Sequence, residues 1–339
     1  MREESLEGRI ARRHRALREI RRFFDARGFL EVESSLLVVA PTTEPHIDPF
    51  EVAVRLGPEA HGARRFLRTS PELALKRVIA GGLSRVYELG RVFRDGEKGP
   101  LHLPEFTLLE WYRAGAGLSD LVADLEGLLR ALAESFHGRP AIPLPAGGLL
   151  DVESPFERRT VAELFLELAG IDLAAALSEM AAGDDEALVE RVRERGHKLR
   201  PGADFEDAFF HVMVSVVEPA IGKERPVVVE RWPRQMAVLS RLCDDDPRFA
   251  ERFELYAAGL ELANAFDELT DPEEQRARFV EDNAARERLG KPALPLDEVF
   301  LTELARMPKT AGIALGVDRL LMLLFGARDI DEVNALPFR

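Results

Sequence analysis

The stretch FRDGEKGPLHLPEFTLLEWYR, residues 93–113, joins a charged, glycine-bearing loop to a mainly apolar run. The run is typical of a β-strand, in which successive side chains point to opposite faces. Glu110 and Tyr112 then share a face with Phe106. A carboxylate on such an apolar face is costly unless a cation meets it. Either an arginine of the protein or a ligand ammonium would satisfy Glu110, and the run taken alone favours the internal salt bridge.

Composition narrows the classes of protein that the chain can be. Its 339 residues are 46% hydrophobic and carry a net charge of −14, so the overall field repels a polyanion and disfavours bulk binding of nucleic acid. The single cysteine, Cys243, excludes an intrachain disulfide and fits a reducing compartment. No apolar run approaches the roughly 20 residues of a membrane span. These features predict a cytoplasmic protein without a membrane anchor.

The order of elements indicates an α+β fold with a mainly antiparallel sheet, because strands and helices do not alternate regularly. A helix with arginines from Arg9 to Arg22 comes first, and its basic face is interpreted as solvated in preference to a nucleic-acid patch. Ser70 is predicted to cap a helix over 70–82, with Pro71 at the first helical position.

The other elements follow from periodicity and from capping residues. Residues 118–218 are predicted to be mostly helical, with a break at 138–148, and Asp271 is predicted to begin a helix that runs to Gly290. Strands are predicted at residues 29–39, 50–56, 65–69, 85–93, 105–113, 226–231, 236–241 and 252–263.

A second group of acidic residues lies in RFELYAAGLELANAFDEL, residues 252–269. Glu254, Glu261 and Glu268 recur there among small and apolar residues, which leave room for a ligand. Such carboxylates suit ligation of Mg²⁺ and capture of an amine. An edge strand with solvated carboxylates explains the segment equally well when it is taken alone.

The segment GIALGVDRLLMLLFG, residues 312–326, places a glycine-bearing apolar strand directly before a helix. The helix is predicted to begin near Asp318 and Arg319, so that its amide groups and its positive dipole end lie beside a guanidinium. This arrangement suits a phosphate. An ordinary strand-to-helix joint with a surface arginine is the alternative.

Taken together, these segments resemble the catalytic domain of class II aminoacyl-tRNA synthetases, and specifically its lysyl branch. VFRD with EFTLLEWYR resembles motif 2, GIALGVDR resembles motif 3, and RRFFDARGFLEVESSLL resembles motif 1. TSPELALKR, RFELYAAGLELANAFDEL and LTDPEEQRARFVEDN extend the similarity over nearly the whole chain. The resemblance implies a single catalytic domain over residues 1–339, with a helical middle segment at about 118–218.

Within that branch, the chain is most similar to the elongation factor P lysine ligase family. It starts almost at motif 1, which leaves no room for an N-terminal OB-fold module of the kind that reads an anticodon. Ala314 also stands where the synthetases carry glycine. Three departures, at Gly96, Leu103 and Ala265, predict that contacts with the nucleotide differ from the family pattern. Ser35 replaces the usual proline of motif 1, which supports a dimer interface.

The resemblance implies an ATP site. Arg94 would hold the α-phosphate and the substrate carboxylate, Arg319 would hold the γ-phosphate, and Phe106 would stack on adenine. Arg94 and Arg319 would be the catalytic residues. The implied ATP-binding set is Arg94, Asp95, Gly96, Glu97, His102, Phe106, Glu254, Leu255, Gly316 and Arg319.

The resemblance also implies a metal and an amine site. Glu254 and Glu261 would ligate Mg²⁺ that bridges the phosphates. Glu110, Tyr112 and Glu268 would receive the side-chain ammonium of the substrate. The implied substrate-binding set is Ser70, Pro71, Glu72, Glu110, Tyr112, Glu261, Asn264, Glu268 and Ala314.

The function implied by the resemblance is adenylation of lysine or β-lysine with ATP, followed by transfer to a lysine side chain of elongation factor P. A homodimer is expected, and tRNA is not an expected partner. Two alternatives stay open. One is a free-standing lysyl-tRNA synthetase-like enzyme that makes another aminoacyl product, and the other is a non-catalytic paralogue that binds an amino acid.

Overall fold

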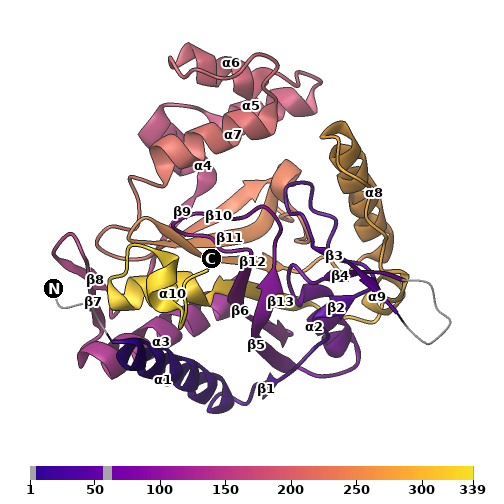
Figure 1. The fold of residues 1–339 in the computed structure, drawn as a ribbon. Helices are drawn as coiled ribbons and strands as arrows, with labels where there is room; N and C mark the ends of the chain where they lie inside the picture. Colours follow the sequence, from indigo (N-terminus) through magenta and orange to yellow (C-terminus); the bar gives the residue numbers. More distant parts are fainter. Residues whose placement is uncertain (1–4, 56–62, 339) are drawn as a thin grey trace. The chain divides into compact units, whose positions relative to one another are not determined.

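The computed structural model describes residues 5–55 and 63–338. The chain forms two compact units: the first unit combines Met1–Leu121 with Asp267–Arg339, and the second unit is Val122–Phe266. Figure 1 follows the chain through both units. The organisation as a single domain stays a prediction.

The sheet of the first unit carries the strands that the motif 2 and motif 3 segments predicted. β1 runs parallel to β5, whereas β5 with β6 and β6 with β13 are antiparallel. A smaller antiparallel sheet has the order β2, β4, β3. The strands are β1 (Leu30–Glu31), β5 (Arg85–Phe93), β6 (Glu105–Ala114), β13 (Thr310–Gly316), β2 (Leu37–Val38), β4 (Ala63–Leu67) and β3 (Glu51–Val54).

Five α-helices and a short 3-10 helix accompany these strands among the described residues of the first unit. α1 lies beside α10 and η4, and α2 packs against α9 (Figure 1). Asp271 caps α8 through the backbone N–H groups of Glu273 and Glu274, as predicted. The helices are α1 (Leu6–Asp25), α2 (Glu72–Ala80), α8 (Pro272–Arg288), α9 (Glu298–Leu304), α10 (Val317–Phe325) and η4 (Ile330–Val333).

The basic face of α1 is only partly solvated, which corrects the sequence interpretation. Arg13 Nη1 donates to Asp318 Oδ1 at 2.6 Å, and the Arg12 guanidinium lies 4.1 Å from the ring centroid of Phe325. Arg9 donates to two backbone carbonyls near η4. Residues three and four apart share a helix face, so these three arginines turn together toward the C-terminal elements.

The second unit combines strands of a mixed sheet, with antiparallel and parallel neighbours, with a group of helices (Figure 1). β12, β11 and β10 are antiparallel neighbours, and β9 runs parallel to β10. A separate hairpin joins β7 to β8. The strands are β12 (Leu260–Asp267), β11 (Phe249–Ala257), β10 (Val227–Pro233), β9 (Glu157–Thr160), β7 (Ala141–Pro143) and β8 (Leu149–Asp151).

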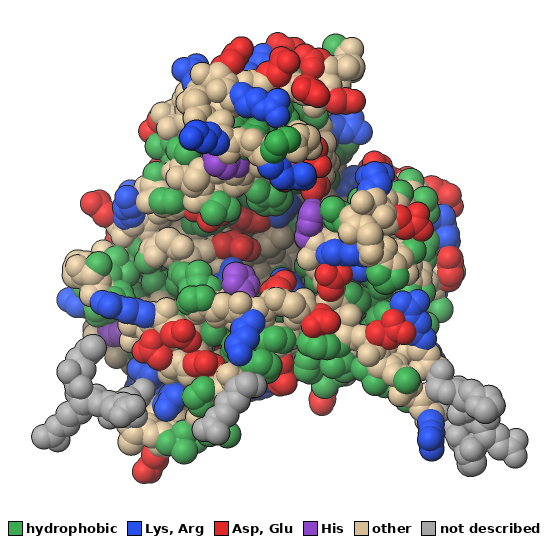
Figure 2. All heavy atoms as spheres, turned by 45° about the horizontal axis from the view of Figure 1, so that its top comes forward, with side chains coloured by type: hydrophobic (Ala, Val, Ile, Leu, Met, Phe, Trp, Pro, Cys, Tyr) green, Lys and Arg blue, Asp and Glu red, His purple; other side chains and the backbone are tan. Residues whose placement is uncertain are grey.

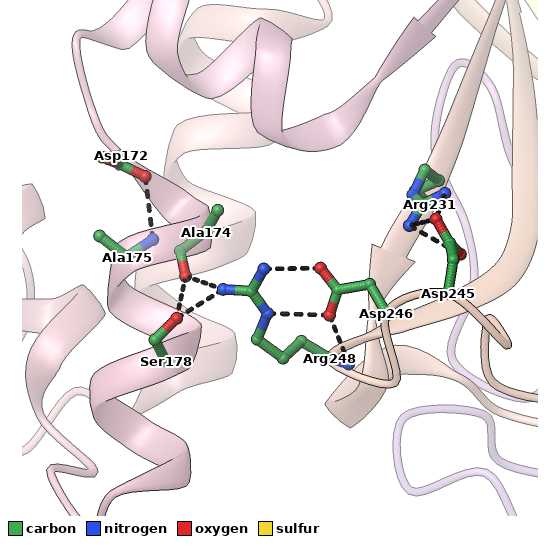
Figure 3. A network of polar contacts seen from close by, with 8 residues as sticks. All are labelled: Asp172, Ala174, Ala175, Ser178, Arg231, Asp245, Asp246 and Arg248. Carbon is green, nitrogen blue, oxygen red and sulfur yellow. Dashed lines mark hydrogen bonds and ion pairs between the residues drawn. The ribbon is translucent and has the colours of Figure 1, made fainter.

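The helices that follow β9 in the second unit pack on β10 and β11 through one apolar core. Phe165, Phe209 and Trp232 are fully or almost fully buried in it. Arg248 adds a polar link, because its guanidinium binds Asp246 and the carbonyl of Ala174 (Figure 3). The helices of the second unit are α3 (Leu118–His137), α4 (Val161–Leu164), η1 (Phe165–Ala169), α5 (Leu173–Ala181), α6 (Ala187–Glu194), α7 (Phe205–Val212), η2 (Met213–Val217) and η3 (Arg234–Met236).

Several predicted elements need correction although the α+β class is confirmed. The single strand predicted at 252–263 is a hairpin, because Ala258 and Gly259 adopt positive φ angles of 52° and 80° and turn the chain. The strand predicted at 236–241 is absent from the described structure, and η3 occupies its beginning. The strand predicted at 29–39 is divided between β1 and β2, which belong to different sheets.

Charged side chains of both signs are interspersed over the face drawn in Figure 2, in keeping with 46 basic and 60 acidic residues. No broad basic surface is visible on that face. Within the described part of the chain, no helix is long and apolar enough to cross a bilayer.

Candidate functional site

Strand β6 places Glu110 and Tyr112 on one face, as the alternation of the sequence predicted. Both side chains are buried, with exposed fractions of 1% and 3%. Tyr112 Oη donates a hydrogen bond to Glu110 Oε2 at 3.2 Å. On the neighbouring strands, Glu88 of β5 and Ala314 of β13 are the register partners of Glu110. Glu110 is therefore buried on this face of the sheet, and the Tyr112 hydroxyl is its hydrogen-bond donor from the same strand.

Ser70 supplies the second hydroxyl to Glu110. Its Oγ donates to Glu110 Oε1 at 2.5 Å and accepts the backbone N–H of Glu72 at 2.9 Å. Helix α2 starts later than predicted, because Pro71 is the N-cap and Ser70 precedes it. No ion pair reaches Glu110 from the part of the chain that the structure describes. The internal salt bridge favoured by the run alone is therefore wrong.

Burial has a large effect on the protonation of Glu110. It raises the pKa of this carboxyl to about 8, and the nearby Glu72 adds to the rise, against the hydrogen bonds from Ser70 and Tyr112. Burial and the Glu110 carboxylate raise the pKa of Tyr112 well above its usual value, so this side chain stays a hydroxyl donor. An ammonium beside Glu110 would favour the ionised carboxylate, since an opposite charge lowers the pKa of an acid.

Lys76 connects the two other buried carboxylates. Its Nζ lies 2.6 Å from Glu72 Oε1 and 2.6 Å from Glu268 Oε2. Burial alone would lower the pKa of Lys76, but the two carboxylates raise it overall. Burial raises the pKa of Glu268, and Lys76 opposes that rise. We call the following residues the acidic cluster: Ser70, Glu72, Lys76, Glu110, Tyr112 and Glu268.

Strand β13 faces the acidic cluster with two small residues. Gly312 is the register partner of Tyr112, and Ala314 is that of Glu110. A β-carbon on Gly312 would lie closer than 3.0 Å to the Tyr112 ring and to Oε1 of Glu268. Real side chains do not approach so closely, so only glycine allows these two side chains their present positions.

The loop of motif 2 brings an arginine to an aromatic ring. The Arg94 guanidinium lies 5.2 Å from the centroid of the Phe106 ring, and its Nη1 lies 3.8 Å from Glu97 Oε1. Arg94 Nε is buried without a hydrogen-bond partner. Gly96 turns the loop with φ of 78°, and its N–H donates to Asp95 Oδ1. The unsatisfied Nε is a donor that a phosphate or carboxylate oxygen would satisfy.

The start of α10 brings a second arginine to the motif 2 loop. Arg319 Nε donates to the carbonyl of Leu101 at 3.3 Å, and its guanidinium contacts Nε2 of His102. Gly316 is the N-cap at the joint between β13 and α10. His102 and Arg319, which are distant in sequence, thus lie together in the first unit.

Asp318 fixes the joint that carries Arg319. Its Oδ2 accepts the backbone N–H of Thr107 at 2.7 Å, and its Oδ1 accepts Nη1 of Arg13. The side chain is almost fully buried. The motif 1 helix, the motif 2 strand and the motif 3 helix are therefore connected through one carboxylate.

The second unit carries the Glu254 group. Arg252 Nη2 donates to Glu254 Oε1 at 2.6 Å, and Tyr256 Oη donates to Oε2 at 2.5 Å. Burial raises the pKa of Glu254, and the neighbouring Glu261 carboxylate adds to the rise. Asn264 accepts a bond from Arg252 Nε at 3.1 Å. Two carboxylates that repel each other favour a cation beside them.

The donor set of Glu254 and Glu261 fits Mg²⁺. Each oxygen of Glu254 accepts one hydrogen bond and keeps a second lone pair. The described residues contain no group of three or more His, Cys, Asp or Glu side chains suited to a metal. Two carboxylates are nevertheless enough, because Mg²⁺ bound with a nucleotide usually takes its other ligands from water and phosphate.

One implied ATP residue is placed differently from the rest. Leu255 is fully buried in β11 and is the register partner of Ala263. Its side chain has no polar atom, so a contact with nucleotide would have to use the backbone.

Sequence reasoning missed four residues of these groups. Arg252 and Tyr256 flank Glu254 at alternate positions of one strand, which is a pattern that could have indicated them. Lys76 follows Glu72 by four residues on a helix, the spacing of an ion pair. Gly312 gave no signal, because its role depends on a strand that is distant in sequence.

Comparison with known proteins places the chain in a family. The family model described as tRNA synthetases class II (D, K and N) matches residues 1–339. The chain therefore belongs to the class II aminoacyl-tRNA synthetase family, and the resemblance drawn from its motifs is confirmed.

Its relatives define the branch more narrowly. The elongation factor P–(R)-β-lysine ligase of Histophilus somni strain 2336 is 39% identical over 323 residues, which are 95% of this chain and 92% of the relative. Proteins of the same name from Proteus mirabilis strain HI4320 and Yersinia enterocolitica are 38% and 39% identical. Each of these two matches covers 97% of this chain and 94% of the relative.

Proposed function

We propose that this chain is an ATP-dependent ligase that adenylates (R)-β-lysine or lysine and transfers the aminoacyl group to a lysine side chain of elongation factor P. The observation that carries the proposal is Glu110, a buried carboxylate that receives two hydroxyl groups and no cation from the described residues. A substrate ammonium would supply the positively charged partner that Glu110 lacks among the described residues. The names of the relatives support the acceptor and the donor.

The acidic cluster binds the amines of the substrate in this proposal. Glu110, Tyr112 and Glu268 receive the side-chain ammonium, and Glu72 borders the second amine. Glu268 Oε1 has no hydrogen-bond partner and is buried, so it is available to an ammonium donor. A buried ion pair with several hydrogen bonds fixes the orientation of the substrate and selects substrates that carry an amine at this position.

Adenylation needs positioning rather than a protein nucleophile. The substrate carboxylate oxygen attacks the α-phosphorus of ATP, the bond to the β-phosphate oxygen breaks, and pyrophosphate leaves. Arg94 orients the carboxylate and the α-phosphate, while Arg319 holds the γ-phosphate. Glu254 and Glu261 would hold Mg²⁺, which neutralises phosphate charge when bound.

Transfer then follows from the mixed anhydride. The uncharged ε-amine of the acceptor lysine attacks the acyl carbon, an amide bond forms, and the bond between acyl carbon and phosphate oxygen breaks. AMP leaves with the electron pair, and the attacking nitrogen loses a proton. Phe106 stacks on the adenine and so retains the nucleotide through both steps.

We also propose a homodimer and a cytoplasmic location. The segment that resembles motif 1 and the two residues after it expose four large apolar side chains, which a second copy would cover. The single cysteine is buried and unpaired, as a reducing compartment permits. The exposed apolar residues are Leu30, Leu36, Leu37 and Val39.

Exchange of pyrophosphate into ATP tests the adenylation step. Purified protein should support exchange with (R)-β-lysine or α-lysine, and not with 6-hydroxynorleucine, which has a hydroxyl in place of the side-chain amine. Exchange with neither lysine would favour the non-catalytic paralogue. Exchange together with efficient charging of tRNA would favour the free-standing synthetase, which the net charge of −14 disfavours.

A further inference from the structure

Lys76 occupies a central position in the acidic cluster although no substrate contact is assigned to it. It projects from α2, its side chain is fully buried, and its Nζ lies 2.6 Å from both Glu72 and Glu268. These two carboxylates come from different parts of the first unit. A fully buried ammonium that binds two carboxylates fixes the position of both.

The charged groups around Lys76 can be assigned element by element. Helix α2 contributes Glu72, the segment after β12 contributes Glu268, and β6 contributes Glu110 with the hydroxyl of Tyr112. The charges of these groups affect one another. Glu72 adds to the raised pKa of Glu110, and Glu72 and Glu268 both add to the raised pKa of Tyr112. Lys76 is the cation among them.

Two further ion pairs involve residues next to members of the acidic cluster. Each joins one positive to one negative side chain and has no net charge. Arg68 Nη1 is 2.6 Å from Glu88 Oε1, both side chains are almost fully buried, and Glu88 is the register partner of Glu110 on the neighbouring strand. On α2, Arg77 binds Glu303 of α9 at 2.7 Å, at the partly exposed side of the helix. Neither pair changes the charge of the acidic cluster.

The charge balance of the acidic cluster follows from these contacts. When ammonium groups of a substrate bind and all three carboxylates are ionised, the three carboxylates and the Lys76 ammonium together carry two negative charges. Lysine and β-lysine each carry two ammonium groups at neutral pH. The two positive charges of either substrate would therefore neutralise the two negative charges of the acidic cluster.

We propose that Lys76 is a positioning residue that holds Glu72 and Glu268 in place and supplies the positive charge between them, so that the acidic cluster accepts a substrate with two ammonium groups. This inference rests on the proposed function, because it concerns the recognition of a diamino acid. Lys76 acts through the two carboxylates and does not touch the substrate. Glu268 gives one oxygen to Lys76, while its Oε1 has no hydrogen-bond partner and is left for the substrate.

Removal of the Lys76 charge should change the pH dependence of substrate binding. In Lys76→Met, the pKa of Glu268 would rise further, because Lys76 opposes the effect of burial on this carboxyl, and the substrate would have to displace a more tightly held proton. The KM for lysine at pH 7 should rise about tenfold or more, because buried carboxylates without a counter-ion take up protons. The midpoint of the pH profile of kcat/KM should move upward by about one unit. The KM for ATP should not change.

Lys76→Arg is the matched control, because it retains the charge. Its midpoint should stay with that of the wild type, whatever its effect on stability measured by thermal unfolding. If Lys76→Met does not fold, Lys76→Gln replaces it, since an amide can donate to both carboxylates without a charge. An unchanged midpoint in the neutral variant, or an equal shift in Lys76→Arg, overturns the proposal and leaves Lys76 a packing residue.

A second measurement counts protons directly. Calorimetry of lysine binding at pH 8.5, in two buffers of different ionisation enthalpy, gives the number of protons released on binding. The wild type should release fewer protons than Lys76→Met, because Lys76 opposes the rise that burial causes in the pKa of Glu268. Equal proton release by the two proteins overturns the proposal. Binding is measured here without ATP, so a failure of adenylation would be seen separately, in the exchange assay.

Discussion

Gly312 lies directly opposite Tyr112 in the ladder of β6 and β13, and any β-carbon on it would collide with the tyrosine ring. Gly312→Ala should therefore displace Tyr112 and Glu268. Overpacking of this kind costs about 1–3 kcal/mol, so the KM for lysine should rise by roughly 5- to 150-fold. Steady-state pyrophosphate exchange at saturating ATP measures the change.

Gly117→Ala is the control for Gly312→Ala, because a β-carbon on Gly117 would meet nothing within 4 Å. It should leave the KM for lysine and the KM for ATP unchanged. Wild-type kinetics in Gly312→Ala would show that Tyr112 does not need its present position.

Glu110 predicts a pH dependence of substrate binding. Its pKa of about 8 means that the carboxyl is mostly protonated at pH 7 in the free protein. It must lose this proton to pair with an ammonium. The KM for lysine should therefore fall as the pH rises from about 7 to about 9, below the pKa of roughly 10.4 at which the substrate amine loses its charge. A KM that is flat over this interval would contradict the assignment.

Glu110→Gln gives an independent check through stability. The folded protein binds a proton at Glu110 that an unfolded chain, with a normal carboxyl pKa, has released between about pH 4.5 and 8. The wild type thus loses stability as the pH rises through this interval. Gln cannot titrate, so the melting temperature of the variant relative to wild type should be higher at pH 8.5 than at pH 5. Its lysine-dependent exchange should be lost.

The sequence predicts the chemistry of β6 well, because strand alternation is a local property. It placed Glu110 and Tyr112 on one face, and the hydrogen bond between them confirms this. It did not predict that Lys76 would bind Glu268, since that contact joins residues that are distant in the chain. The run of β6 alone favoured a salt bridge at Glu110, whereas the ion pairs of the acidic cluster form at Glu72 and Glu268. The sequence missed these pairs because they depend on the tertiary fold.

Turns and caps were the weaker part of the prediction. Ala258 has a positive φ, which alanine rarely adopts, so composition gave no reason to divide 252–263 into a hairpin. Ser70 was predicted as the N-cap of α2, but Pro71 is the N-cap, and the Ser70 hydroxyl donates to a buried carboxylate while it accepts the backbone N–H of Glu72. Tertiary contacts of this kind override local preference.

Arg94 and Glu254 test the phosphate and metal assignments. Arg94→Ala or Glu254→Gln should reduce exchange by roughly 10²- to 10³-fold, because loss of a charge contact in the transition state typically costs about 3–4 kcal/mol. Circular dichroism should show that the fold persists. Arg91→Ala is a control for the first variant, since Arg91 is a half-exposed arginine of β5 that pairs with Glu105. Exchange like that of wild type in either site variant would remove the assignment.

Ala314 tests the choice between the two lysines. Its register partner is Glu110, so its methyl group faces the carbons that bear the substrate amines in the proposed site. One methyl group is worth about 1–3 kcal/mol of discrimination. Ala314→Gly should raise kcat/KM for α-lysine relative to (R)-β-lysine by about tenfold or more. If Ala314 only packs the strand, both substrates will weaken alike and the ratio will not change.

Mass spectrometry of elongation factor P tests the central claim most directly. The factor is incubated with the purified protein, ATP, Mg²⁺ and (R)-β-lysine, and in parallel with the Arg94→Ala variant. The account predicts that the wild-type protein adds one β-lysyl group to a single lysine of the factor and that the variant adds none. An unmodified factor, under conditions in which the same protein preparation charges tRNA, would contradict it.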